Sequence, residues 1–173
     1  MIELVLGGSR SGKSRHAESL AMGSGLAVTY VATAVAGDAE MADRIAQHQL
    51  RRPVEWGLAE APRDLATHLA RLAAPDRFLL VDCLTLWLSH VLEDDNPLPW
   101  NREREALLTI VPKLPGRIVM VSNETGLGIV PMGRLTRRFA DEAGLLHQEL
   151  ARLCHRVTFL VAGLPIFLKG TEP

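Results

Sequence analysis

Cysteine is scarce in this chain of 173 residues and occurs only as Cys83 and Cys154. Two cysteines are too few for a disulfide framework and lack the close pairing of a zinc site, and they are typical of a reducing cytosol. An excess of one charge is also lacking, because 19 lysines and arginines face 20 aspartates and glutamates and the net charge is −1. The broad basic face on which nucleic-acid binders depend is therefore not expected.

The sequence also lacks a hydrophobic run of membrane-spanning length. Apolar stretches such as residues 78–92 are interrupted by polar side chains and are shorter than the roughly 20 apolar residues that a spanning helix needs. With 47% hydrophobic and 23% charged residues, the composition is that of an ordinary globular protein. We expect a single domain over residues 1–173, located in the cytoplasm, with no membrane span and no nucleic-acid partner.

Short apolar runs of strand length alternate along the chain with segments of helical spacing. The expected strands are residues 2–6, 27–32, 78–82, 117–122 and 157–162. The expected helices are residues 13–22, 39–50, 63–73, 84–92, 101–111 and 134–154. Most of the strand segments are rich in Val, Ile and Leu without alternation, which is typical of strands buried on both faces. The pattern predicts an α/β fold with a mostly parallel sheet covered by helices on both sides.

Three segments fit this alternation less well. Residues 53–60 are compatible with a short strand or with an ordered loop. Residues 93–100, reading EDDNPLPW, indicate a turn-rich connection. Residues 166–169 are expected to form a final strand at an edge of the sheet, where a nearby proline is tolerated.

The strongest motif lies at residues 7–14, where GGSRSGKS fits G-x-x-x-x-G-K-[ST] between an apolar strand and a helix. Its glycines let the backbone wrap around phosphate oxygens, and the dipole of the following helix adds to the anion site. We expect Lys13 to neutralise the β- and γ-phosphates and the Ser14 hydroxyl to ligate Mg²⁺. A nucleoside triphosphate is thus the expected ligand of Gly7, Gly8, Ser9, Arg10, Ser11, Gly12, Lys13 and Ser14.

Asp82 is the candidate for the second ligand on the magnesium side. It closes an apolar strand, so its carboxylate is expected at the carboxyl edge of the sheet, where open α/β sheets bind their ligands. The alternative is that Asp82 caps the helix that begins near Leu84, a position that suits aspartate.

A second candidate site lies on the helix expected over residues 39–50. Arg44 and His48 are spaced i and i+4 on one face, and Arg51 and Arg52 follow a turn later. Guanidinium groups beside an imidazole would neutralise a phosphate and disfavour the imidazolium, which suits a nitrogen nucleophile attacking phosphorus. The spacing alone favours an exposed helix that carries scattered charges.

Several motifs in order resemble one known family over residues 2–169. They are GGSRSGKSRHAE, the segment Ala32–Ala34, the pattern EMADRI…H…RRP…W…AE, LLVDCLT, and VSNETGLGIVP at residues 121–131. The chain resembles the bifunctional adenosylcobinamide kinase/adenosylcobinamide-phosphate guanylyltransferases of cobalamin biosynthesis. The resemblance implies a RecA-like P-loop fold, a three-layer sandwich, and a homo-oligomer, with a trimer as the assembly described for the family.

The resemblance also implies the reaction and its residues. The corrinoid substrate adenosylcobinamide is phosphorylated with a nucleoside triphosphate, ATP or GTP, and GMP from GTP is then transferred to the new phosphate through a GMP–histidine on His48. The implied catalytic residues are His48 and Lys13, with Mg²⁺ at Ser14 and Asp82. Besides the loop, the implied GTP contacts are Ala32, Thr33, Ala34, Gln49, Leu50, Arg51, Arg52, Glu60 and Asp82.

Two further segments bear on this interpretation. Residues 123–131 follow a buried strand, and we expect them to face the corrinoid or a neighbouring subunit, whereas plain turn chemistry is the alternative. The helix after Arg138 departs from the family pattern at Ala140 and His147. His147 and the other histidines apart from His48 are expected to be surface or structural residues. The alternative function is a single-function P-loop small-molecule kinase in which His48 is inert.

Overall fold

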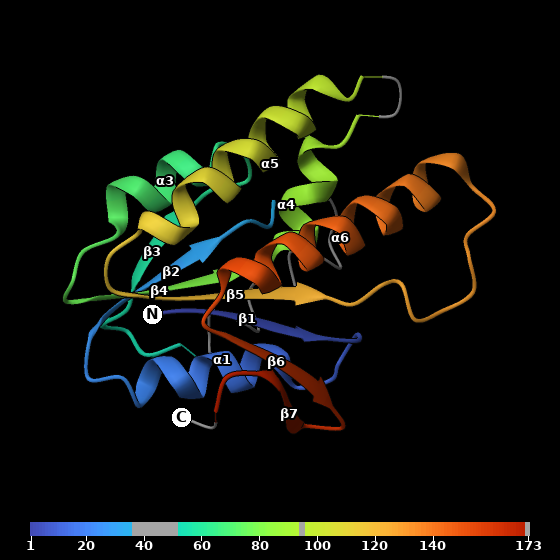
Figure 1. Ribbon diagram of the computed structural model, residues 1–173. Coiled ribbons are helices and arrows are strands. Elements are labelled where there is room, and N and C mark those ends of the chain that lie inside the picture. Colours follow the sequence, from blue (N-terminus) through green and yellow to red (C-terminus); the bar gives the residue numbers. More distant parts are fainter. Residues whose placement is uncertain (36–51, 94–95, 172–173) are drawn as a thin grey trace.

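A computed structural model of the protein describes residues 1–35, 52–93 and 96–171. These residues form one sheet with helices on both of its faces (Figure 1). The strands are β1 (Ile2–Gly7), β2 (Ala27–Ala32), β3 (Gly57–Glu60), β4 (Arg77–Asp82), β5 (Arg117–Asn123), β6 (Arg156–Val161) and β7 (Leu164–Lys169). The helices are α1 (Lys13–Met22), α3 (Leu65–Leu72), α4 (Leu84–Val91), α5 (Leu98–Ile110) and α6 (Arg134–Leu153), with a short 3-10 turn at Val111–Lys113.

The sheet has seven strands in the order β3-β2-β4-β5-β1-β6-β7. Every neighbouring pair is parallel except β6 and β7, which are antiparallel. All six residues of β1 are buried, as expected for a strand covered on both faces. Strand β5 lies between β1 and β4, so the strand that leads into the phosphate motif and the strand that ends at Asp82 are both hydrogen-bonded to it. The predicted α/β class with a mostly parallel sheet is confirmed.

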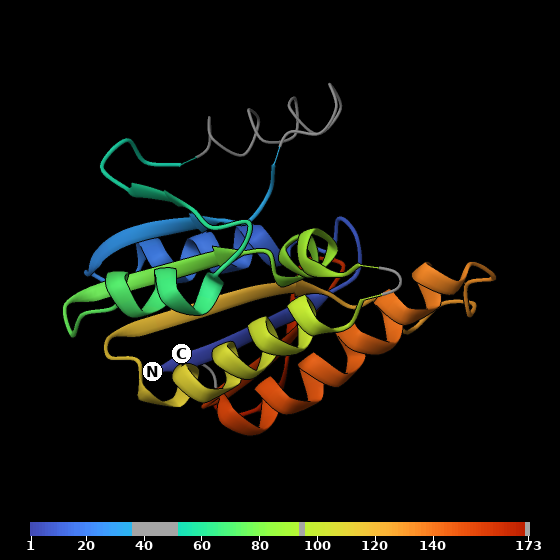
Figure 2. The same cartoon turned by 90° about the horizontal axis from the view of Figure 1, so that it is seen from above.

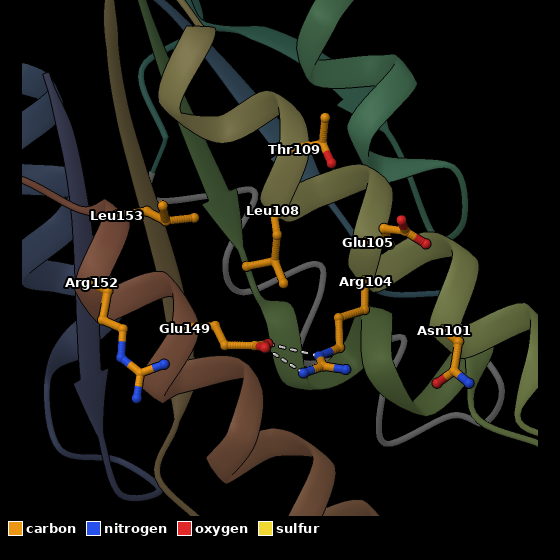
Figure 3. A pocket seen from close by; sticks show the side chains of 8 residues that line it. All are labelled: Asn101, Arg104, Glu105, Leu108, Thr109, Glu149, Arg152 and Leu153. Carbon is orange, nitrogen blue, oxygen red and sulfur yellow. Dashed lines mark hydrogen bonds and ion pairs between the residues drawn. The ribbon is translucent and has the colours of Figure 1, made fainter.

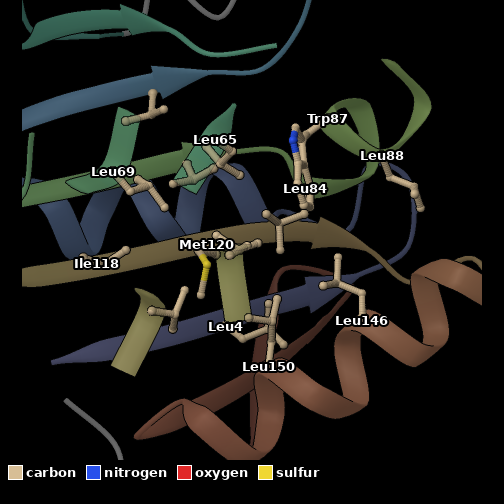
Figure 4. Packing of buried hydrophobic residues seen from close by; sticks show 14 of the residues in the cluster. Leu4, Leu65, Leu69, Leu84, Trp87, Leu88, Ile118, Met120, Leu146 and Leu150 are labelled. Atoms are coloured by element: carbon tan, nitrogen blue, oxygen red, sulfur yellow. The ribbon is translucent and has the colours of Figure 1, made fainter. Parts of the chain in front are cut away.

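Two apolar clusters hold the three layers together. The helices α3, α4, α5 and α6 pack on one face of the sheet and α1 on the other, and α5 and α6 run alongside each other over that first face (Figure 2). Figure 4 shows the larger cluster, in which Leu146 and Leu150 of α6 lie against Leu4 of β1 and Met120 of β5. None of the helices in the described part of the chain is long and apolar enough to cross a membrane.

The element boundaries follow the sequence within a few residues, with one correction. The helix expected from residue 101 begins at Leu98, so the end of the predicted turn at residues 93–100 is helical. Pro99 favours a turn in the sequence, but in the structure it occupies the first turn of α5, where a missing N–H costs no hydrogen bond. Residues 57–60 form the short strand that was one of two alternatives, and β7 is the expected edge strand. The helix expected over residues 39–50 lies outside the described residues.

Candidate active site

The phosphate motif forms the loop between β1 and α1 at the carboxyl edge of the sheet. Two of its residues have left-handed backbone angles, with φ of 56° at Arg10 and 95° at Gly12. Gly7 is required for space, because a Cβ there would lie 2.4 Å from Ser11 Oγ and 2.8 Å from the Leu160 carbonyl oxygen. The glycines therefore allow the tight backbone path that a phosphate-binding loop needs.

Main-chain hydrogen bonds fasten this loop on two sides. The Glu124 N–H donates to the Gly7 carbonyl at 3.0 Å, and the Gly163 N–H donates to the Ser11 carbonyl at 2.9 Å. Behind the loop, α1 begins with no acidic residue in its first turn and no side-chain cap. The N–H groups at the positive end of the helix dipole therefore point at an anion site.

Lys13 holds its ammonium group inside the loop. Its Nζ donates to the Gly8 carbonyl at 3.0 Å, and the residue is largely buried. Burial lowers the pKa of Lys13, and the negative charge of Asp82 opposes that shift, so the two side chains lie within electrostatic reach of each other. Ser11 Oγ is buried and has no hydrogen-bond partner among the described residues, which is typical of a polar atom that a ligand satisfies.

Asp82 lies at the end of β4, in one register row with Ala32 of β2 and Val121 of β5. Helix α4 takes Cys83 as its N-cap residue, without a side-chain cap hydrogen bond. The alternative in which Asp82 caps this helix is therefore wrong. Burial raises the pKa of Tyr30, and the charge of Asp82 adds to that shift, so this carboxylate faces the same side of the sheet as the Tyr30 hydroxyl.

The donor set at this edge fits a magnesium ion that arrives with a nucleotide. Mg²⁺ keeps several waters and is held by one or two protein oxygens together with substrate phosphates, rather than by a cage of side chains. The described residues contain no group of three or more His, Cys, Asp or Glu that could hold a metal ion by themselves. The carboxylate of Asp82 and the hydroxyl of Ser14, which directly follows Lys13, are hard oxygen donors of the kind that Mg²⁺ prefers.

The segment Ala32–Ala34 is tied to the end of β4 through Thr33. Thr33 Oγ1 donates to the Cys83 carbonyl at 2.7 Å and accepts from the Cys83 N–H at 2.8 Å. The Thr33 N–H donates to the Asp82 carbonyl at 3.4 Å. Thr33 is fully buried. Its side chain therefore fixes the position of this segment beside Asp82.

Glu60 and Arg52 border the same edge further along the sheet. Glu60 ends β3 in register with Ala32. The guanidinium carbon of Arg52 lies 3.3 Å from the centroid of the Tyr30 ring, a cation–π contact. Arg52 Nε is buried without a hydrogen-bond partner among the described residues. Glu60 therefore lies at the carboxyl edge of the sheet, and Arg52 packs on Tyr30 of the neighbouring strand β2.

One arrangement at this edge escaped the sequence analysis. His147 of α6 lies against the end of β5, with Nε2 2.7 Å from Ser122 Oγ and Nδ1 3.6 Å from Glu124 Oε2. Burial lowers the pKa of His147, and the Glu124 carboxylate opposes that shift. Of the two expected alternatives, surface or structural, the structure shows a buried histidine that contacts the end of β5. No local pattern joins these residues, because 25 positions separate His147 from Ser122.

A separate groove of about 560 Å³ lies between α5 and α6 (Figure 3). The Arg104 guanidinium crosses it and donates twice to the Glu149 carboxylate. The groove belongs to the helix layer, and none of its lining residues comes from the phosphate loop or from the ends of β1, β4 or β5. We therefore place the candidate active site at the sheet edge.

Comparison with known proteins identifies the family of this chain. The model of the cobinamide kinase / cobinamide phosphate guanyltransferase family matches residues 3–168. The chain belongs to this family.

Curated relatives of this chain match it over nearly its full length. The bifunctional adenosylcobalamin biosynthesis protein CobP of Pseudomonas aeruginosa is 61% identical over 173 residues, which is 100% of this chain and 99% of the relative. The bifunctional adenosylcobalamin biosynthesis protein CobU of Salmonella typhimurium is 38% identical over 182 residues, which is 98% of this chain and 100% of the relative. The family resemblance stated from the sequence motifs is confirmed.

One solved structure illustrates the fold. PH0250 of Pyrococcus horikoshii OT3 superposes with a TM-score of 0.54 at 11% identity, covering 99% of this chain and 87% of that chain. At this identity the likeness concerns the fold alone, and it agrees with a helix-covered, mostly parallel sheet over nearly the whole chain.

The structure of this family member brings most of the predicted site together. The loop at residues 7–14, the segment Ala32–Ala34, Glu60 and Asp82 all lie at the carboxyl edge of the sheet. Arg52 stands over Tyr30 near that edge. The predicted residues His48, Gln49, Leu50 and Arg51 lie outside the described residues, so their roles stay predictions.

Proposed function

We propose that this chain phosphorylates the aminopropanol hydroxyl of adenosylcobinamide with ATP or GTP and then transfers GMP from GTP to the new phosphate. The products are adenosyl-GDP-cobinamide and pyrophosphate. One observation carries the proposal: a complete strand–loop–helix phosphate site, with Lys13 inside it and Asp82 within its electrostatic reach, occurs in a chain that is 61% identical over its full length to a bifunctional cobalamin biosynthesis protein.

The phosphoryl step depends on positioning and charge neutralisation. The substrate hydroxyl oxygen attacks the γ-phosphorus, the bond from that phosphorus to the β–γ bridging oxygen breaks, and the nucleoside diphosphate leaves. Lys13 and the loop N–H groups balance the negative charge on the phosphates. A magnesium ion held by Ser14 and Asp82 would supply further charge neutralisation on the phosphate oxygens.

We propose that the guanylyl step proceeds through His48, an assignment that the family resemblance supports. An imidazole nitrogen attacks the α-phosphorus of GTP and pyrophosphate leaves, which gives a covalent GMP–histidine. A phosphate oxygen of adenosylcobinamide phosphate then attacks the same phosphorus, and breaking the N–P bond restores the imidazole. A covalent intermediate divides one difficult displacement into two easier ones.

The nucleotide is proposed to lie along the carboxyl edge of the sheet. Its phosphates would occupy the loop at Gly7–Ser14, and the rest would extend past Ala32–Ala34 and Asp82 toward Glu60 and Arg52. The register supports this path, because Glu60, Ala32 and Asp82 occupy one row across β3, β2 and β4.

The assembly and the location of the protein are further proposals. Exposed apolar side chains of the loop after β5, at Leu127, Ile129 and Val130, and of β7, at Leu164 and Leu168, favour burial against a corrinoid or a neighbouring subunit. We propose a homo-oligomer, a trimer by resemblance to the family. A cytoplasmic location agrees with two cysteines that are both free thiols.

Labelling with GTP that carries radioactive α-phosphate tests the guanylyl step. The wild-type chain with Mg²⁺ should form an acid-labile protein adduct, and His48→Ala should form none while it retains measurable phosphorylation of adenosylcobinamide. His155→Ala is the matched control, because this ring accepts a hydrogen bond from the Ile2 N–H at the opposite end of β1. A label that persists in His48→Ala would reject the covalent route. Phosphorylation without any adduct or GMP transfer in the wild type would establish the single-function kinase.

A further inference from the structure

We infer that Glu124 is the general base of the phosphoryl transfer and that His147, anchored on Ser122, positions its carboxylate. The inference rests on the proposed kinase function and adds the group that removes the proton from the substrate hydroxyl. Neither Lys13 nor a magnesium ion supplies such a group, and kinases commonly use a carboxylate for it.

The place of Glu124 in the sheet is the first argument. Glu124 directly follows β5, which lies between the strand that leads into the phosphate loop and the strand that ends at Asp82. Its N–H donates to the carbonyl of Gly7, the first residue of the loop motif, at 3.0 Å. The backbone of Glu124 is thus fixed between the site of the β- and γ-phosphates and the proposed magnesium ligand, where the acceptor hydroxyl must approach.

The contacts of the carboxylate are the second argument. Glu124 Oε1 accepts the Gly126 N–H at 2.8 Å. The other oxygen, Oε2, lies 3.6 Å from His147 Nδ1, beyond hydrogen-bond length, and 20% of the side chain is exposed. One oxygen therefore fixes the orientation of the carboxylate, and the other is available to a substrate hydroxyl from solvent.

His147 provides the support behind this carboxylate. Only 5% of the residue is exposed, and its Nε2 lies 2.7 Å from Ser122 Oγ. Its Nδ1 is buried without a hydrogen-bond partner among the described residues and faces Glu124. Burial keeps the pKa of His147 low, which favours a neutral ring. A neutral ring with its N–H on Nδ1 would stabilise the Glu124 carboxylate. It would lower the basicity of that carboxylate less than a charged imidazolium in an ion pair would.

Two other described carboxylates at this edge are less suited to the role. Asp82 lies within electrostatic reach of Lys13 and is the proposed magnesium ligand, a role that competes with proton abstraction. Glu60 lies on β3, the edge strand of the sheet, and three strands separate it from β1. Glu124 alone of the three follows a strand hydrogen-bonded to β1.

The proposed step balances as a simple proton transfer. As the hydroxyl oxygen forms its bond to the γ-phosphorus, the hydroxyl proton passes to Glu124 Oε2, and the bond to the β–γ bridging oxygen breaks. Glu124 later releases the proton to solvent. The guanylyl step needs no such base, because its acceptor is a phosphate monoester that is already largely ionised at neutral pH.

This difference between the two steps gives the test. Glu124→Gln keeps the shape of the side chain and removes its basicity, so the kcat of adenosylcobinamide phosphorylation should fall about 10²- to 10⁴-fold. Guanylyl transfer to ready-made adenosylcobinamide phosphate should fall much less. Glu124→Asp, which keeps the carboxylate, should recover part of the lost kcat. Glu105→Gln, on the exposed face of α5, is the matched control.

A double-variant comparison tests the role of His147. His147→Asn should lower the kcat of phosphorylation with little change in the KM for ATP, and it should have little further effect when Glu124→Gln is already present, because both changes act on one carboxylate. A purely structural histidine would lower activity by the same factor in both backgrounds. Ser122→Ala provides a second variant should His147→Asn not fold.

The outcomes separate this inference from the proposed function. If the wild type phosphorylates adenosylcobinamide and Glu124→Gln does so with an unchanged kcat, the base assignment is wrong and the kinase function stands. If Glu124→Gln impairs both transfers equally, Glu124 binds the corrinoid instead of acting as a base. If the wild type phosphorylates no cobinamide at all, the proposed function itself fails.

Discussion

Replacing Lys13 by alanine is the most direct perturbation of the phosphate site. The side chain is largely buried, with its ammonium held inside the loop by one hydrogen bond to the Gly8 carbonyl. With a nucleotide bound, this positive charge faces the phosphate oxygens at which negative charge is redistributed during transfer. Removing a single preorganised donor of this kind typically costs about 2.7–4 kcal/mol, which is about 10²- to 10³-fold in kcat.

The effect of Lys13→Ala on stability should be much smaller. The variant loses one hydrogen bond, worth about 1 kcal/mol, and it also removes a charge whose burial is unfavourable, as the lowered pKa of Lys13 indicates. These contributions have opposite signs. We expect the free energy of unfolding to change by less than about 1 kcal/mol, so that a loss of activity would not reflect unfolding.

The assays follow both transfers in the same preparations. Phosphorylation is measured with ATP labelled in the γ-phosphate, guanylyl transfer with GTP and adenosylcobinamide phosphate, and stability by urea unfolding. Both transfers should fall in Lys13→Ala, because one loop is proposed to bind the triphosphate for each. Lys113→Ala is the control, since this exposed lysine lies in the 3-10 turn after α5. A folded Lys13→Ala variant that retains more than about a tenth of the wild-type kcat would refute the assignment of the loop.

Two further predictions concern stability. Gly116→Ala should lower the free energy of unfolding by about 2–4 kcal/mol, because Gly116 has φ of 80° and a Cβ there would lie 2.2 Å from the Ala74 carbonyl oxygen. Gly144→Ala, in an open helical position of α6, should instead raise it by about 0.5–1 kcal/mol, and urea unfolding distinguishes the two. The pKa of His147 is lowered in the folded protein. Below about pH 6.5 the unfolded chain therefore binds more protons at this histidine than the folded chain does, and the free energy of unfolding should decrease as the pH falls. The thermal midpoint should therefore drop less between pH 7.5 and 5.5 in His147→Asn than in the wild type, and an equal or larger drop would contradict this.

The phosphate loop and Asp82 could be predicted because their signals are local. The loop is a contiguous motif between a strand and a helix, and Asp82 closes an apolar run, so each position follows from a few neighbouring residues. The start of α5 was missed for a local reason as well, since Pro99 suggests a turn although it suits the first turn of a helix.

The order of the strands could not be predicted in the same way. Nothing in residues 117–123 indicates that they pair with both β1 and β4, because that choice depends on how the helices cover the two faces. The contact of His147 with Ser122 and its approach to Glu124 result from this order and from the packing of α6. The sequence motifs therefore predicted where the candidate phosphate loop lies, whereas the neighbours of the loop depended on the three-dimensional arrangement.

The two hydrogen bonds that fasten the phosphate loop both use backbone atoms, with donors at positions 124 and 163. At position 124, any residue except proline would keep the donor. Position 163 is more restricted, because Gly163 has φ of 81°, a conformation that favours glycine. The side chain at position 124 can thus differ between relatives while the phosphate loop keeps its backbone conformation. Substitutions at position 124 can therefore change the side chain beside the loop while the loop backbone keeps this hydrogen bond.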